Sequence, residues 1–181
     1  MVEVTIVPDS SFYICFLDDI NKPQYFIRML SYETFKFVSG PLIKKEIINS
    51  SNYPMIEKVV GARIQIFVYY NYGEILRPLF SFDEIKRGEH EVIVISYILY
   101  LFNIRFITIL DDNETKKFLL RNFPHISTKV TGTIGFVKLS CCTYKIFSKD
   151  EAISILNLIK KSRFRVKGDI VDQIMEEIKR C

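Results

Sequence analysis

The sequence is poor in the residues from which proteins build nitrogen- and sulfur-ligated metal centres. Among its 181 residues are only two histidines and four cysteines. No two cysteines have the CxxC spacing that is typical of a zinc ligand pair or a redox pair. The composition therefore argues against a zinc centre and against a Cys/His nucleophile pair. We expect the cysteines to be small buried apolar side chains; they are Cys15, Cys141, Cys142 and Cys181.

Long hydrophobic runs and low-complexity segments are also missing. The longest nearly unbroken apolar run covers residues 92–102, whereas a membrane-spanning helix needs roughly 18 or more such residues. Seven glycines and six prolines, with 49% hydrophobic and 25% charged residues, are typical of a globular chain. Glu3 stands where a secretory signal would carry positive charge. We therefore expect a cytoplasmic protein with no membrane partner, and a buried core helix at residues 92–102.

Two phosphate-binding motifs are absent as well. The chain has neither GxGxxG nor GxxxxGK[ST], which leaves little support for a nucleotide-binding or phosphatase domain of the common α/β lineages. The net charge of +4, from 25 basic and 21 acidic residues, permits attraction to a polyanion without demonstrating it. The basic residues gather at Lys44–Lys45, at Lys116–Lys117 and in residues 160–167. Each cluster, taken alone, is typical of a solvated helix face.

Short β-branched segments alternate with amphipathic ones along the chain. This order predicts the α/β class, a three-layer α/β/α sandwich with a central, mostly parallel sheet. We expect one domain over residues 1–181, closed by two helices at about residues 148–180, where Ser148 and Glu151 have capping-box spacing. Ser10 and Ser11 are candidate caps of the first helix. The expected strands are residues 2–7, 35–38, 63–70, 105–110 and 127–130, with a short turn or helix at residues 79–87.

Acidic residues follow the expected strands. Asp9 comes after the first strand, and Asp111 and Asp112 come after residues 105–110. Sites in open α/β sheets form beyond the carboxyl ends of the strands. Each acid taken alone is explained by a helix cap or an exposed charge. Several carboxylates in one crevice repel one another unless a cation is present, and hard oxygen ligands select Mg²⁺ or Mn²⁺.

Five motifs in order resemble those of the PIN-domain ribonucleases, in particular their VapC-like toxin branch. Asp9-Ser10-Ser11 resembles the first acidic motif, and the acid in Gly40-Pro41-Leu42-Ile43-Lys44-Lys45-Glu46-Ile47 resembles the second. Gly88-Glu89-His90-Glu91 is similar to the start of the central helix that supplies the third. Leu110-Asp111-Asp112, with Thr115 and Lys116 behind it, is similar to the fourth motif. Val130-Thr131-Gly132-Thr133-Ile134-Gly135 matches the last-strand turn.

The resemblance implies a Mg²⁺- or Mn²⁺-dependent endoribonuclease that cleaves single-stranded RNA with a metal-activated water. The implied metal ligands are Asp9, Glu46, Glu89 and one of Asp111 and Asp112, with Glu91 as a further candidate. Ser10 and Thr133 are candidates for holding a metal-bound water or a phosphate oxygen, and Lys44, Lys45 and Lys116 for binding the RNA backbone. Members of this branch are often toxins that form homodimers and are blocked by a small antitoxin protein. The alternative is a degenerate PIN-like module that binds RNA or protein without cleaving.

Overall fold

The computed structural model describes residues 3–66 and 88–181. The first part of the chain contains three strands and five helical segments. They are β1 (Val4–Pro8), α1 (Ser10–Ile14), the π-helical turn η1 (Cys15–Asp19), α2 (Pro23–Leu30), β2 (Phe35–Ser39), α3 (Pro41–Ile48), α4 (Tyr53–Arg63) and β3 (Ile64–Ile66). The second part contains α6 (Gly88–Leu101), β4 (Phe106–Ile109), α7 (Asn113–Asn122), α8 (Pro124–Ser127), β5 (Val130–Thr131), α9 (Thr133–Cys142), α10 (Lys149–Lys161) and α11 (Gly168–Arg180). No helix in these two ranges is long and apolar enough to span a membrane.

The five strands form one parallel sheet in the order β3-β2-β1-β4-β5. Strand β1 is central, with Ile6 paired to Phe37 of β2 on one side and to Ile107 of β4 on the other. Because both neighbours are parallel to β1, the carboxyl ends of the strands meet at one edge of the sheet. The prediction of an α/β fold with a parallel sheet is confirmed.

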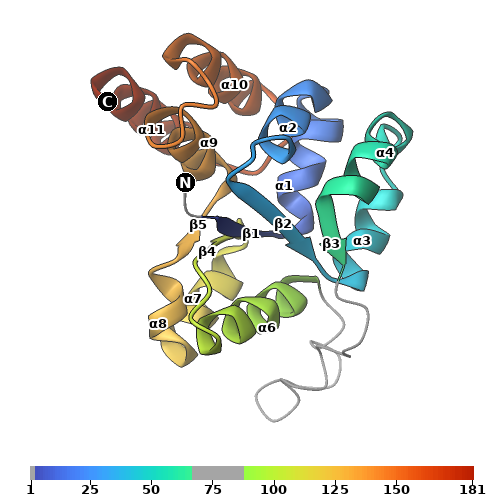
Figure 1. The fold of residues 1–181 in the computed structure, drawn as a ribbon. Helices are drawn as coiled ribbons and strands as arrows, with labels where there is room; N and C mark the ends of the chain where they lie inside the picture. Colours follow the sequence, from blue (N-terminus) through green and yellow to red (C-terminus); the bar gives the residue numbers. More distant parts are fainter. Residues whose placement is uncertain (1–2, 67–87) are drawn as a thin grey trace.

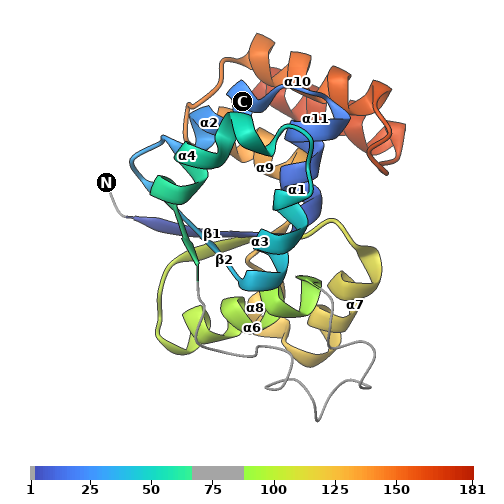
Figure 2. The same ribbon diagram turned by 90° about the vertical axis from the view of Figure 1, so that its right-hand side faces the viewer.

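Helices cover both faces of the sheet and make three layers. Figures 1 and 2 show α6, α7 and α8 on one face and α1, α2, α9, α10 and α11 on the other. Beneath the second group lies a cluster of aromatic rings in mostly edge-on contact, at centroid separations of 5.3 to 6.4 Å around Phe12. Its members, Phe12, Phe16, Phe26, Phe37 and Phe136, are fully buried. Edge-on packing adds to the apolar burial that holds these helices on the sheet.

Several expected boundaries differ from those in the structure. The strand expected at residues 127–130 is wrong in its first part, because Pro124–Ser127 is helix α8 and β5 contains only Val130–Thr131. Proline at the first helical position has a backbone angle suited to a helix start, and this local preference outweighs the β-branched pattern. Helix α2, which also begins at a proline, has no counterpart among the expected elements. Of the strand expected at residues 63–70, Ile64–Ile66 is present as β3. The remainder and residues 79–87 lie outside the described residues.

Side chains cap the starts of α1 and α10. Asp9, and not Ser10 or Ser11, is the cap of α1. The capping box at the start of α10 is confirmed, with Glu151 N–H donating to Ser148 Oγ at 3.2 Å. Glu151 also pairs with Arg28 Nη1 at 2.5 Å, and this hydrogen bond lowers the pKa of the Glu151 carboxyl to about 2. The pair ties α10 to α2 on the same face of the sheet.

Two of the cysteines are not the free buried thiols that we expect from the sequence. Cys142 at the end of α9 and Cys181 after α11 form a disulfide, with their Cα atoms 5.7 Å apart. Cys15 and Cys141 are free and buried, as expected. The pair is 39 residues apart in sequence, so only the packing of α11 on α9 brings the two sulfurs together. Since disulfides persist mainly in oxidising surroundings, the cysteines do not support the expected cytoplasmic location.

Candidate functional site

The carboxyl ends of β1 and β4 form the topological switch point of the sheet. The chain runs from β1 to β2 and β3 on one side of β1, whereas β4 and β5 lie on its other side. Ligands of doubly wound α/β folds bind in the crevice at such a point, beyond the strand ends. The last residue of β1, Pro8, is paired with Ile109 of β4. Asp9 and Asp111 follow these two strands and therefore lie at the switch point.

Asp9 joins the two strand ends through both of its carboxylate oxygens. Its Oδ1 accepts a hydrogen bond from Phe12 N–H at 3.1 Å, and its Oδ2 accepts one from Asp111 N–H at 3.0 Å. The residue is only 2% exposed. Burial, followed by repulsion from Asp111 and Glu89, raises the pKa of Asp9 to about 7, although the two backbone donors oppose this shift. With a pKa near neutrality, this buried acid is stabilised by a proton below about pH 7 or by a cation when it is ionised.

Asp111 is held by the start of α9. Its Oδ1 accepts from Thr133 N–H at 2.9 Å, and its Oδ2 accepts from Thr133 Oγ1 at 2.5 Å. A Cβ on Gly132 would lie 2.8 Å from Asp111 Oδ1 and 3.4 Å from Lys116 Nζ, so glycine allows this close approach. Burial raises the pKa of Asp111, while Thr133 and the Lys116 charge oppose the rise. The fully buried Thr133 hydroxyl therefore serves to orient Asp111, and Lys116 Nζ lies 3.4 Å from the Asp111 carbonyl oxygen.

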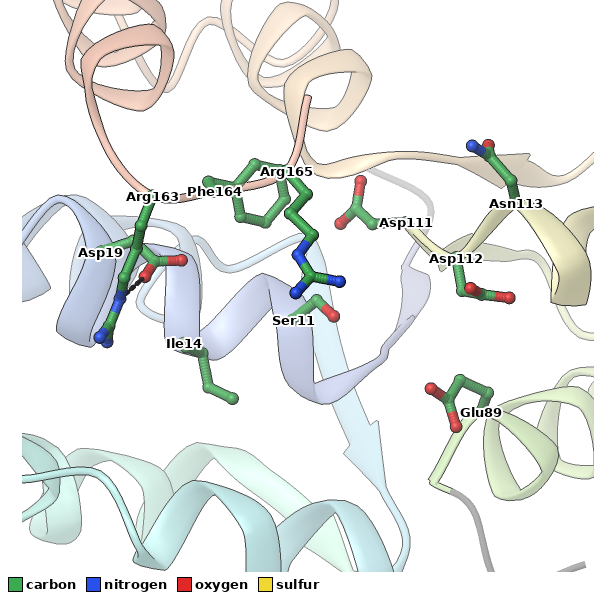
Figure 3. Close-up of a pocket in the computed structure, with 10 residues that line it drawn as sticks. All are labelled: Ser11, Ile14, Asp19, Glu89, Asp111, Asp112, Asn113, Arg163, Phe164 and Arg165. Atoms are coloured by element: carbon green, nitrogen blue, oxygen red, sulfur yellow. Dashed lines mark hydrogen bonds and ion pairs between the residues drawn. The ribbon is translucent and has the colours of Figure 1, made fainter. Parts of the chain in front are cut away.

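Glu89 and Asp112 join Asp111 around one cavity. Asp112 is the cap of α7 and accepts from Thr115 N–H at 2.6 Å, while Glu89 comes from the first turn of α6. Figure 3 shows the carboxylates of Glu89, Asp111 and Asp112 on one side of the cavity. Its volume is about 430 Å³, which is in the range of small-ligand sites. The lining residues are Ser11, Ile14, Asp19, Glu89, Asp111, Asp112, Asn113, Arg163, Phe164 and Arg165.

Asp9 is hydrogen-bonded to Asp111 but does not itself line the cavity. Two further acids of the expected ligand set lie elsewhere. Glu91 is 1% exposed and accepts from Leu42 N–H at 3.2 Å and Ile43 N–H at 3.0 Å, so it caps α3. Glu46 is exposed on α3, and its Oε1 would be 3.2 Å from a Cβ on Gly88. Neither lines the cavity. The candidates Ser10, Lys44 and Lys45 also lie outside its lining, and both lysines are exposed on α3.

The loop between α10 and α11 provides a wall of the cavity that the expected site does not include. Arg163, Phe164 and Arg165 reach the site from residues far from every acidic motif. The only feature of the sequence that points to this wall is the basic cluster at residues 160–167, and this cluster by itself is typical of a solvated helix face. Helix periodicity cannot reveal that this loop folds back over the ends of β1 and β4.

The residues at the switch point fit a hard divalent cation through their chemistry. The converging donors are carboxylate oxygens, the ligand type that Mg²⁺ and Mn²⁺ prefer. The charged form of Asp9 is destabilised by burial and, to a smaller extent, by its acidic neighbours. Within residues 3–66 and 88–181, the only three candidate ligand atoms that lie within 4.8 Å of one another belong to Cys141, Cys142 and Cys181. In the described residues, therefore, no three carboxylate oxygens lie close enough together to bind one ion directly.

Comparison with protein-family models, with curated proteins and with solved structures finds no match to this chain. The fold and the cavity define a doubly wound parallel α/β domain with an acidic site at its switch point.

The stability of the metal-free protein is expected to decrease as pH rises from about 4 to about 7 and to level off above neutrality. Since the pKa of Asp9 is raised from 3.8 to about 7 in the folded state, the folded chain binds a proton that the unfolded chain has lost. This contribution is complete below the unfolded pKa and disappears as pH passes the folded one, at a cost on the order of a few kcal/mol. Urea unfolding in EDTA across this pH window measures it.

The variant Asp9→Asn provides the control, because it has no carboxyl to titrate at this position. Its free energy of unfolding should depend less on pH than that of the wild type. Saturating Mn²⁺ should flatten the wild-type curve by stabilising the ionised form. Equal pH dependence in the wild type and in Asp9→Asn would contradict the burial argument.

Proposed function

We propose that this chain is a Mg²⁺- or Mn²⁺-dependent endoribonuclease that hydrolyses single-stranded RNA. The observation that carries the proposal is the hydrogen bond that joins the buried Asp9 to Asp111 at the switch point, where Asp111 lines one cavity with Glu89 and Asp112. The resemblance of the five motifs to PIN-domain nucleases supports the same reading. When bound, the cation supplies an activated water and neutralises charge on the phosphodiester.

The side chains of the chain have distinct tasks in this proposal. Asp9, Glu89, Asp111 and Asp112 would hold the cation, one or two of them directly and the others through its bound waters, with Thr133 orienting Asp111. Lys116, which donates to the Asp111 carbonyl at 3.4 Å, would offset the negative charge of the site. Glu91 would act at a distance, because it anchors the start of α3 next to α6, the helix that carries Glu89. Glu46 would be an outer residue of the site.

Cleavage of a short labelled single-stranded RNA by the purified wild-type chain tests the proposal. We expect cleavage with Mn²⁺ or Mg²⁺ and none in EDTA, because no protein nucleophile is assigned. The exposed acid Glu114, which pairs with Lys117 outside the cavity, offers a matched control. Its variant Glu114→Gln should cleave at the wild-type rate. Cleavage that persists in EDTA would contradict a metal-dependent reaction.

A second candidate is a PIN-like module that binds RNA or protein without cleaving. It is favoured by the carboxylate spacing, since no three acids of the described residues bring ligand oxygens within 4.8 Å of one another. Titration with Mn²⁺ separates the two candidates. Intact RNA affinity without Mn²⁺ binding or cleavage supports the module and contradicts the nuclease.

The toxin branch adds proposals about partners and location. In that branch the chain would act in the cytoplasm as a homodimer and be blocked by a small antitoxin protein. Growth arrest on expression, relieved by a co-expressed neighbouring gene product, supports a toxin. Unaffected growth supports an RNA-processing enzyme with the same chemistry.

A further inference from the structure

The loop between α10 and α11 places two arginines with different surroundings at the acidic cavity. Arg163 Nε donates to Asp19 Oδ1 at 2.5 Å. Figure 3 shows the Arg163 side chain directed to Asp19 and away from the carboxylates of the opposite wall. Arg165 extends into the cavity toward Ser11. Its guanidinium has no ion pair or hydrogen bond with the described residues. Arg163 is thus neutralised within the fold, whereas Arg165 presents its charge to the cavity.

An unpaired guanidinium in a cavity is suited to an anionic ligand. Its planar set of N–H donors matches two oxygens of a phosphate group, and such charge-assisted pairs are stronger than neutral hydrogen bonds. The opposite wall carries Glu89, Asp111 and Asp112. The carboxylates of that wall would by themselves repel a phosphate. A cation bound to the carboxylates and the guanidinium of Arg165 would together attract it from the two sides of the cavity. The loop also brings Phe164 to the cavity, an apolar surface next to the guanidinium.

We propose that Arg165 binds a phosphate of the single-stranded RNA substrate and that Arg163, Phe164 and Arg165, the loop residues that line the cavity, form the RNA-binding wall of the site. This inference rests on the proposed ribonuclease function for the identity of its ligand. Arg163 has a positioning role, because its pair with the 8%-exposed Asp19 side chain fixes the loop against η1. The substrate thereby lies between the carboxylate wall and a basic loop that belongs to the C-terminal helices.

The test compares Arg165→Ala with Lys167→Ala, which removes the same charge from the same loop. Lys167 is exposed, does not line the cavity, and precedes α11 without a side-chain capping bond. Fluorescence anisotropy with a short single-stranded RNA in EDTA at low ionic strength measures affinity without cleavage. We expect Arg165→Ala to raise Kd about tenfold and Lys167→Ala less than about twofold. Arg165→Lys should be intermediate, because it keeps the charge and loses the planar fork.

The salt dependence and the kinetics distinguish phosphate contact from simple charge balance. Loss of one phosphate contact should lower the slope of log Kd against log salt by about 0.7 for Arg165→Ala only. With Mn²⁺, the same variant should raise KM and leave kcat nearly unchanged. Unchanged Kd and KM, or equal weakening in Lys167→Ala, overturns the assignment of Arg165.

The outcomes separate this inference from the proposed function. RNA binding that depends on Arg165, without Mn²⁺-dependent cleavage, overturns the nuclease and supports the phosphate contact. Mn²⁺-dependent cleavage with an unchanged KM in Arg165→Ala overturns the phosphate contact alone. A folded wild-type chain that binds no RNA in either buffer overturns both.

Discussion

Replacement of Asp9 by asparagine is expected to reduce Mn²⁺-dependent RNA cleavage by at least about 100- to 1000-fold. The carboxylate is buried at the switch point and linked to Asp111, so its negative charge acts in a region of low dielectric. Asparagine keeps one oxygen that can accept the hydrogen bond from Phe12 N–H and cap α1, but its amide nitrogen cannot accept the bond from Asp111 N–H. The loss of this one bond costs about 1–3 kcal/mol, so the variant should still fold while its metal affinity falls. Cleavage rates and Mn²⁺ titration by calorimetry measure the two effects.

Asp112→Asn provides an informative comparison, because Asp112 caps α7 through its contact with Thr115 and asparagine caps helices equally well. We expect a smaller loss than in Asp9→Asn. Glu114→Gln, in the first turn of the same helix, should retain full activity. If Asp9→Asn cleaved RNA at the wild-type rate, the Asp9 carboxylate would have no role in the reaction.

Gly40→Ala is expected to destabilise the protein by about 2–4 kcal/mol, which lowers Tm by roughly 5–15 °C. The new Cβ would lie 1.9 Å from Glu91 Cδ, and Glu91 is 1% exposed with its carboxylate bound to the start of α3. The side chain has no solvent into which it can move without breaking its bonds to Leu42 and Ile43. The backbone is not the cause, because Gly40 has φ −102° and ψ 175°, angles that any residue adopts. Chemical denaturation measures the effect.

Two further variants isolate this cause. Gly61→Ala in α4 meets nothing within 4 Å, and alanine is favoured over glycine in a helix, so it should be neutral or stabilising by about 1 kcal/mol. Glu91→Ala is destabilising by itself because the buried N–H of Ile43 and the partly buried N–H of Leu42 lose their acceptor. The double variant Gly40→Ala/Glu91→Ala should cost less than the sum of the two single changes. If the two destabilisations were strictly additive, the contact between the new Cβ and Glu91 would not be the cause of the Gly40→Ala effect.

The roles of Glu89 and Glu91 show the limit of sequence reasoning about the site. Both follow Gly88 at the start of α6, and their spacing alone does not say which faces the switch point. Residues two apart on a helix do not share a face, so one of the two had to point elsewhere. The structure directs Glu89 to the cavity and Glu91 to α3. The decision depends on where α3 packs, which no local pattern encodes.

The same limit applies to the apolar run at residues 92–102. Its hydrophobicity correctly predicts a core helix, and Val92, Ile93 and Val94 are buried. However, Phe102 is 74% exposed and Leu101 is 58% exposed. The sequence shows that the segment is apolar, but how much of the helix is buried depends on how far the neighbouring elements extend along it.

The amino-acid sequence alone determined the class of the fold and the place of the acids after β1 and β4. Both depend on local information: the alternation of strand and helix periodicities, and the rule that parallel strands share a carboxyl edge. Tertiary packing alone decided that Asp9 binds Asp111 N–H, that Glu91 caps α3, that Cys142 reaches Cys181 and that Arg165 lies opposite the carboxylates. The first three of these contacts join residues that are 39 to 102 positions apart in the sequence. They form only when whole layers dock, because side-chain shape and burial, and not sequence spacing, select the partner.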